Sequence, residues 1–229
     1  TGTWLREHFT ETLGDMKLLV DDLFLSGVNH IFYHGCCYSP EDAAWPGWLF
    51  YASYEMNPRN PVWHDVDALN AYATRCQSVL QAGQPDHDVL LYWPIHESWQ
   101  TGSPLEMKLT VHAREWFEDQ PIGQAAAWLW SRGFAFDYVS DRMLATATID
   151  GTNLRLPGGA YRTVVVPRCQ HIPLPTMEKL VALAKAGGTV IVEGDLPADV
   201  PGWGALEARR AQLRELVGSL PLAASQGGK

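Results

Sequence analysis

Basic clusters, paired cysteines and long apolar runs are all scarce in this 229-residue chain. Its 17 Lys and Arg residues are outnumbered by 26 Asp and Glu residues, which gives a formal net charge of −9 at pH 7. No run of Lys or Arg occurs, and nucleic-acid binding needs a basic patch, so the composition argues against a nucleic-acid-binding protein. No stretch of about 18 apolar residues occurs either, so no membrane span is expected.

The sequence also lacks the spacings that mark common metal and cofactor sites. It contains no C-x-x-C pair, and its two adjacent cysteines cannot easily bridge to each other, so a zinc site is not expected. We expect reduced, part-buried side chains at all four cysteines: Cys36, Cys37, Cys76 and Cys169. A P-loop, a G-x-G-x-x-G motif, a G-x-S-x-G elbow and an H-E-x-x-H pair are equally absent. The sequence therefore predicts no metal site and no cofactor within this chain.

Tryptophan, in contrast, is abundant. The chain has ten Trp residues beside eight Tyr and seven Phe. Many of these rings are expected in the core, because aromatic side chains bury large areas. Several, however, lie in residues 36–65, a segment with four prolines that follows neither a helical nor a strand pattern. Loops of this length inside a compact domain are uncommon and are usually functional.

Residues 1–83 follow the order expected for the end of a (β/α)8 barrel. Apolar residues at i, i+3 and i+4 predict helices over 8–26 and 66–82, and the run VNHIFYHG predicts a buried strand over 28–35. The long loop 36–65 then follows the carboxyl end of that strand, where a barrel builds its active site. Because one strand and two helices cannot close a barrel, we expect a fragment, the C-terminal part of a barrel catalytic domain.

Residues 84–229 predict a second domain of the α/β class. After a linker at 84–88, apolar strands are expected over 88–94, 135–140, 161–167 and 189–194, with helices over 122–133 and 174–187. Apolar strands that alternate with helices are typical of a parallel sheet covered on both faces. The pattern fits a flavodoxin-like or amidotransferase-like α/β domain that is incomplete. Its apolar faces would support a homo-oligomer.

Four side chains of the first domain are candidate sugar contacts. His34 lies at the carboxyl end of the predicted strand, at the barrel mouth, and a hydrogen-bonded structural histidine is the alternative. Tyr38, Trp45 and Trp48 lie in the Trp-rich loop, and aromatic rings stack on the C–H faces of sugars. The alternative is that these rings pack the loop against the barrel. We predict that all four side chains contact the substrate.

Glycoside hydrolysis needs two carboxylates that flank the scissile bond. The candidates in the first domain are Glu7, Asp15, Glu41, Asp42 and Glu55. Glu7 is the best placed of them, because it directly precedes the first helix, where the preceding barrel strand would feed into its loop. The alternative for Glu7 is a charge favoured by the dipole at the start of a helix. No second carboxylate stands out, so an acid/base pair is not visible.

A nucleophilic cysteine is the other chemical candidate. Cys169, Gln170 and His171 follow the predicted strand 161–167, as the nucleophile of an amidotransferase would. The sharp Gly-rich elbow expected around such a cysteine is absent, so catalysis at Cys169 is not predicted.

Three runs of the sequence carry a resemblance to a known family. They are LSGVNHIFYHGCCYSPEDAAWPGWLFYAS at 25–53, NPRNPVWHDVDALNAYATRCQSVLQAG at 57–83 and DVLLYWP at 88–94. These runs resemble the α-L-rhamnosidase-type glycoside hydrolases of family 106. Later pieces at 135–144 and 161–194 fit the domain after the barrel in that family, and are also similar to the amidotransferase-like domain of some β-galactosidases. The resemblance covers most of the chain and is more specific in its first half.

The resemblance implies a carbohydrate substrate and an inverting glycosidase that acts on terminal L-rhamnose, with two glutamates as acid and base. Of these glutamates, one lies at Glu7, the tentative catalytic residue, or just before Thr1, and the other lies well upstream. The residues that match the sugar-side loop by position are His34, Tyr38, Trp45 and Trp48. Some family members depend on calcium, which makes calcium a candidate cofactor of the full-length protein. Two alternatives stay open: a non-catalytic carbohydrate-binding or oligomerisation fragment, and a β-galactosidase-like glycosidase.

Overall fold

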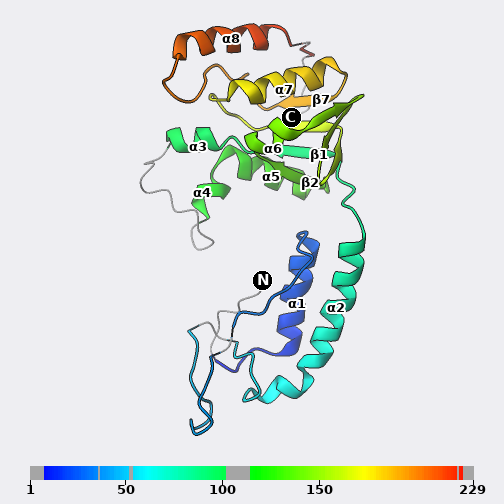
Figure 1. The fold of residues 1–229 in the computed structure, drawn as a ribbon, viewed down its shortest axis with the longest axis vertical. Helices are drawn as coiled ribbons and strands as arrows, with labels where there is room; N and C mark the ends of the chain where they lie inside the picture. The colour runs from blue at the N-terminus through cyan, green and yellow to red at the C-terminus, as the bar shows by residue number, and fades with distance from the viewer. Residues whose placement is uncertain (1–7, 36, 52–53, 102–113, 221, 224–229) are drawn as a thin grey trace. The chain divides into compact units, whose positions relative to one another are not determined.

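The computed structural model describes residues 8–35, 37–51, 54–101, 114–220 and 222–223. The chain divides into two compact units, unit 1 at Thr1–Gln84 and unit 2 at Pro85–Lys229, which Figure 1 draws together. Each unit has its own hydrophobic core. Because unit 1 contains too few elements to define an architecture, its assignment to a barrel stays a prediction.

Unit 1 is built on two helices, α1 at Leu13–Leu25 and α2 at Val66–Ala82, with a short 3-10 helix, η1, at Pro61–Asp65. The structure begins α1 later than the predicted residue 8, because Thr12 and Asp15 form a capping box there. The side chain of Thr12 accepts a hydrogen bond from the Asp15 backbone N–H at 3.1 Å. Met16 and Val20 of α1 are fully buried, and they pack in one cluster with Leu69 of α2.

The strand predicted over 28–35 is wrong. Among residues 28–35 only Tyr33 makes an isolated bridge, and none belongs to a strand. A strand needs a neighbouring strand for its hydrogen bonds, and the described part of unit 1 contains none. Side chains of α2 satisfy this backbone instead: Gln77 accepts from the Ile31 N–H at 2.5 Å, and Gln81 donates to the Asn29 carbonyl at 2.6 Å.

Unit 2 is a mixed α/β unit with a parallel sheet, as the sequence predicts. Its strands are β1 at Val89–Tyr92, β2 at Phe136–Val139, β6 at Thr163–Val166 and β7 at Thr189–Val192. Their order in the sheet is β2-β1-β6-β7, and every neighbouring pair is parallel (Figure 1). Short apolar runs such as TVVV form these strands because their β-branched side chains suit a sheet buried on both faces.

The two faces of this sheet carry separate cores. Leu90 and Tyr92 point to one face, where they pack with residues of α7 at Leu174–Lys185 and α8 at Leu206–Gly218. Leu91 points to the other face and packs with α5 at Pro121–Ser131. This alternation follows from the two-residue period of a strand. Helices therefore cover both faces of the sheet.

Several elements of unit 2 were not predicted. They are α3 at Ile95–Thr101, α4 at Glu115–Glu118, α6 at Asp141–Thr146, α8, and an antiparallel sheet of β3 at Thr148–Asp150, β4 at Asn153–Leu156 and β5 at Gly159–Tyr161. The predicted strand 161–167 is divided at Arg162. Tyr161 pairs with Leu154 in the antiparallel sheet, whereas Thr163 starts the parallel strand β6. No described helix is long and apolar enough to cross a membrane.

Candidate functional site

The Trp-rich loop of unit 1 presents aromatic rings to solvent. The exposed fractions of Tyr38, Trp45, Trp48 and Tyr51 are 87%, 64%, 60% and 81%. Rings that only packed the loop against a core would be buried. An exposed set of rings within a short stretch of chain is instead typical of a ligand-binding surface.

Arg59 fixes the shape of this loop from inside. Its guanidinium donates to the carbonyls of Ala43 at 2.6 Å and Pro40 at 2.9 Å, with a longer bond to Glu41 at 3.4 Å. Its own carbonyl accepts from the indole Nε1 of Trp45 at 3.0 Å. The charged side chain thus satisfies backbone groups that a loop without secondary structure would leave unpaired.

Ser39 and Gly47 complete the loop beside the second tryptophan. The Ser39 hydroxyl accepts from the Trp48 N–H at 2.8 Å. Gly47 has a φ of 89°, and a Cβ at this position would lie 2.5 Å from Ser39 Oγ and 3.2 Å from Arg59 Cδ. Only glycine fits this turn, since other residues are strained at such a φ and would collide with the serine. The loop is therefore built to one conformation.

The four predicted sugar contacts fall into more than one aromatic group. His34 packs edge-on against Phe50, with 5.0 Å between ring centroids. Trp45 instead packs against Phe9 at 5.4 Å. The structure thus places His34, Tyr38, Trp45 and Trp48 on the surface of unit 1. Glu7, the predicted catalytic residue, lies outside the described residues.

Glu55 is the carboxylate that the structure singles out. Its side chain is only 1% exposed. One oxygen, Oε1, accepts from the Phe50 N–H at 3.1 Å and lies 3.4 Å from His8 Nδ1. The other, Oε2, is buried without a hydrogen-bond partner among the described residues. A buried carboxylate is costly, and an unsatisfied oxygen points to a function for it.

Other polar groups of unit 1 are buried as well. Asn60 is 5% exposed, and its amide donates to the Glu55 carbonyl at 3.1 Å. Glu11 is 5% exposed. Burial, with Tyr33 and Glu11 nearby, raises the pKa of Tyr54 to about 12. The sequence offers Glu55 as one of several candidate carboxylates and does not distinguish it, because its burial arises from the folding of the loop and not from a local pattern.

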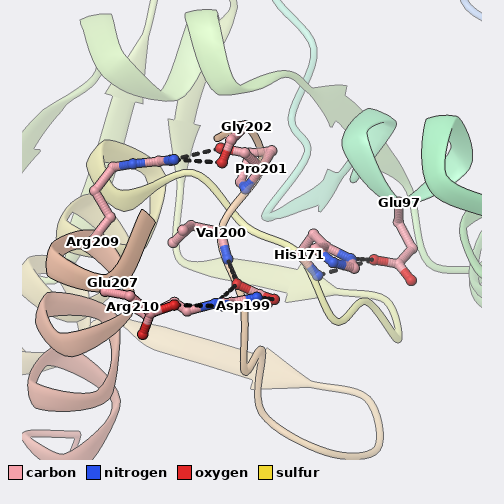
Figure 2. Close-up of polar contacts among 9 residues, drawn as sticks. All are labelled: Glu97, His171, Asp199, Val200, Pro201, Gly202, Glu207, Arg209 and Arg210. Atoms are coloured by element: carbon pink, nitrogen blue, oxygen red, sulfur yellow. Dashed lines mark hydrogen bonds and ion pairs between the residues drawn. The ribbon is translucent and has the colours of Figure 1, made fainter. Parts of the chain in front are cut away.

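In unit 2, polar contacts join the carboxyl ends of the strands. Glu97, after β1, accepts at Oε2 from the backbone N–H groups of Gln170 at 3.0 Å and His171 at 2.9 Å, which follow β6. Nδ1 of His171 lies 2.9 Å from the same oxygen. Figure 2 shows this pair with Asp199 on the opposite side of the histidine. These contacts tie the loop after β1 to the loop after β6.

Two arginines of α8 anchor the neighbouring loop (Figure 2). Arg210 donates to both oxygens of Asp199, at 2.8 and 2.6 Å. Arg209 donates to the carbonyls of Pro201 and Gly202, each at 2.6 Å. Bidentate guanidinium–carboxylate pairs hold a fixed geometry. The segment that follows β7 is therefore fastened to α8.

We expect the Asp199→Asn variant to lose less stability than the wild-type chain as the pH falls. Hydrogen bonds from Arg210 hold the pKa of Asp199 below its ordinary value. Since the folded-state pKa is the lower one, this carboxylate stabilises the fold above about pH 4, and that contribution is lost as the pH falls towards the folded pKa. In urea unfolding between about pH 5 and about pH 2, the wild-type chain should lose more stability than the variant. Glu215→Gln, at an exposed site on the same helix, should follow the wild type, and an equal pH dependence of all three would contradict the assignment.

Cys169 is not poised for nucleophilic chemistry. Its thiol is buried, and burial, with smaller effects from Glu97 and Asp141, raises its pKa to about 12. Because the thiolate is the nucleophile, a protonated thiol at neutral pH is inert. Cys76 and Cys169 are reduced thiols, as predicted, and Cys37 takes part in no disulfide either. Cys36, the fourth predicted thiol, lies outside the described residues.

In the described ranges, no group of three or more His, Cys, Asp or Glu side chains could hold a metal ion. Calcium in the full-length protein stays a prediction.

A family comparison accounts for nearly the whole sequence. The model of a glycoside hydrolase family matches residues 3–223, so the chain belongs with the glycoside hydrolases. The family is glycoside hydrolase family 106, described as alpha-L-rhamnosidase, and the chain belongs to it.

One individual relative has a low sequence identity to this chain. A putative beta-glucuronidase from Formosa agariphila is 25% identical over 191 residues, which cover 82% of this chain and 14% of that protein. The chain therefore spans 14% of the length of this relative.

Two solved β-galactosidases also overlap with the chain. The enzyme from Bifidobacterium adolescentis has 19% identity and a TM-score of 0.34, over 58% of this chain and 53% of its own. A catalytic mutant of a family 42 enzyme from G. stearothermophilus has 10% identity and a TM-score of 0.45, over 69% and 21%. At these scores the likenesses define neither the fold nor the function of this chain.

Proposed function

We propose that the complete protein containing this chain is a glycoside hydrolase that releases terminal L-rhamnose from α-L-rhamnosides with inversion. The observation that carries the proposal is membership of family 106 over residues 3–223. In this proposal unit 1 is the end of a (β/α)8 barrel, and unit 2 is a flavodoxin-like domain that follows it. Oligomerisation through unit 2 stays a prediction.

The exposed rings of Trp45 and Trp48 are proposed to form one wall of the sugar pocket. L-Rhamnose has a methyl group at C6 in place of a hydroxymethyl, which gives it more apolar surface than most hexoses. Aromatic faces cover such surface and exclude water. The Arg59 hydrogen bonds support this role, since a pocket wall must hold its shape before the substrate arrives.

Glu55 is proposed as one of the two carboxylates, beside the earlier candidate Glu7. In an inverting reaction one carboxylic acid protonates the leaving oxygen, while a carboxylate about 6.5–9.5 Å away activates a water on the opposite face. The buried Glu55 side chain supports this role, because its Oε2 has no hydrogen-bond partner among the described residues. The second carboxylate is proposed to be Glu7 or to come from the rest of the protein. Calcium has no step in this mechanism.

A uronic acid substrate is less well supported, although one relative is named a putative beta-glucuronidase. Recognition of a sugar carboxylate calls for a free cationic side chain. Arg59, the arginine of the aromatic loop, is committed to the carbonyls of Ala43 and Pro40. Lys17 pairs with Asp21 at 2.6 Å. The described part of the Trp-rich loop therefore offers no uncommitted guanidinium, which favours a neutral sugar at that loop.

The test is the selectivity of the complete protein among aryl glycosides. We expect kcat/KM for an aryl α-L-rhamnoside to exceed that for the β-D-glucuronide and the β-D-galactoside by at least about 100-fold. Faster hydrolysis of either competitor would refute the rhamnoside assignment. Saturable quenching of Trp fluorescence by L-rhamnose without hydrolysis of any glycoside would favour the non-catalytic carbohydrate-binding alternative.

A further inference from the structure

Unit 2 contains a polar cavity of about 580 Å³ at the carboxyl ends of its parallel strands. None of its lining residues belongs to the Trp-rich loop of unit 1. The charged and amide side chains that line it are Glu97, Asp119, Gln120, Gln124, Arg168, Gln170 and Asp195. Its volume is within the range of small-molecule sites.

The position of the cavity in the sheet favours ligand binding. The sheet order is β2-β1-β6-β7. From β1 the chain continues to β2, on one side of β1, and it later crosses to β6, on the other side of β1. The segments that follow β1 and β6 therefore lead to helices on opposite faces of the sheet, α5 and α7, while Glu97 bridges the two segments close to the strand ends. In open α/β sheets, ligands bind in the crevice at this reversal of strand order, outside the carboxyl ends of the strands.

The walls of the crevice are fixed by hydrogen bonds. Glu97 binds the backbone of Gln170 and His171, as Figure 2 shows for the histidine. On the opposite wall, Arg168 donates to the Gln124 side chain of α5 at 3.1 Å. The loop after β1, the loop after β6 and the start of α5 are thus joined. A site held in this way needs little reorganisation when a ligand binds.

The charges in the cavity disfavour an anionic ligand. The carboxylates of Glu97, Asp119 and Asp195 oppose an anion such as a phosphate. The guanidinium of Arg168, which lies 3.9 Å from Glu193, adds a positive charge and a donor beside them. The side chains of Asp119 and Asp195 make no ion pair with described residues. Gln124 adds an amide to the lining. Carboxylates accept hydrogen bonds from the hydroxyl groups of a ligand, and guanidinium and amide groups donate to those hydroxyl groups.

We propose that this cavity binds a neutral saccharide unit, as a carbohydrate site distinct from the aromatic loop of unit 1. A sugar matches the mixed lining, because each hydroxyl both donates and accepts. The Cys169 thiol, which also lines the cavity, stays protonated at neutral pH and takes no covalent part. The choice of a saccharide among hydroxyl-rich ligands rests on the proposed function.

The test is an NMR titration of the uniformly ¹⁵N-labelled 229-residue chain. The probes are L-rhamnose, D-galactose, spermidine and inorganic phosphate. We expect one of the two sugars to shift the backbone amides of Gln170, Leu196 and Ala198 in a saturable manner. The double variant Asp119→Asn, Asp195→Asn should weaken this binding by about tenfold or more. The control Glu178→Gln, at an exposed site on α7, should leave it unchanged.

Three results would overturn the proposal. They are shifts with spermidine or phosphate but with neither sugar, no shift with any probe, and unchanged sugar binding in a double variant whose spectrum is otherwise native. The indole Nε1 signal of Trp45 reports the aromatic loop separately. If that signal and the hydrolysis assay fail while the cavity amides respond, the proposed function fails and the cavity proposal stands. If the Trp45 signal shifts and the rhamnoside is hydrolysed while the cavity amides do not respond, the cavity proposal fails and the proposed function stands.

Discussion

On the proposed mechanism, we expect Glu55→Gln to lower kcat of the complete protein on an aryl α-L-rhamnoside by about 100-fold or more and to change KM by less than about threefold. The side chain is 1% exposed and one of its oxygens has no partner among the described residues. A glutamine keeps the shape and still accepts from the Phe50 N–H, but it cannot ionise or transfer a proton. The loss therefore concerns the chemical step rather than binding. Steady-state kinetics, with thermal melting to verify folding, measure it.

The matched control is Glu41→Gln. Glu41 lies in the same loop system but its side chain is exposed, and its charge is solvated. We expect this variant to retain kcat within about twofold, since exposed charges contribute little. Wild-type turnover by Glu55→Gln, or a loss matched by a fall in the folded fraction, would remove Glu55 from the proposed mechanism.

The second large effect is expected at Arg59. Arg59→Met removes hydrogen bonds to the carbonyls of Ala43, Pro40 and Glu41. The loop then loses the side-chain contacts that fix residues 40–43, directly before Trp45, whereas the backbone carbonyl at position 59 can still accept from the indole. Because an aromatic wall binds substrate and transition state alike, we expect KM to rise by about tenfold and kcat to stay within about twofold. Kinetics on the same aryl rhamnoside measure both.

The control for this variant is Arg75→Met on α2. The guanidinium of Arg75 makes no hydrogen bond or ion pair with described residues. This substitution should leave KM and kcat unchanged. If Arg59→Met binds the rhamnoside as tightly as the wild type, the aromatic loop is not a pocket wall, and the same result for Gly47→Ala would strengthen that conclusion.

The sequence predicted the regular elements wherever apolar periodicity and caps agreed. The helix predicted over 174–187 is α7 at Leu174–Lys185, and the strand over 189–194 contains β7 at Thr189–Val192. The strand over 28–35 failed, because its residue types suit a strand but the described part of unit 1 offers no neighbour for pairing. Composition reports what a segment can form, whereas pairing depends on residues far along the chain.

The candidate site was predictable only in part. Exposed aromatic rings at Trp45 and Trp48 follow the surplus of Trp in a loop without periodic pattern. The residues next to Arg59 and Glu55 in the sequence do not indicate a role for either side chain. An arginine near prolines and a glutamate after a tyrosine form no recognisable motif. Their importance comes from the folded loop, which surrounds one with carbonyls and buries the other. Such environments depend on long-range packing that no short pattern encodes.

A ¹H NMR time course of the complete protein acting on an aryl α-L-rhamnoside tests the proposed hydrolysis and its inversion in one experiment. We expect signals of β-L-rhamnose to rise first, and the α-anomer to follow only as the free sugar mutarotates. Initial release of the α-anomer would contradict the inverting mechanism. Absence of free rhamnose at every time point would contradict the assignment of an α-L-rhamnosidase.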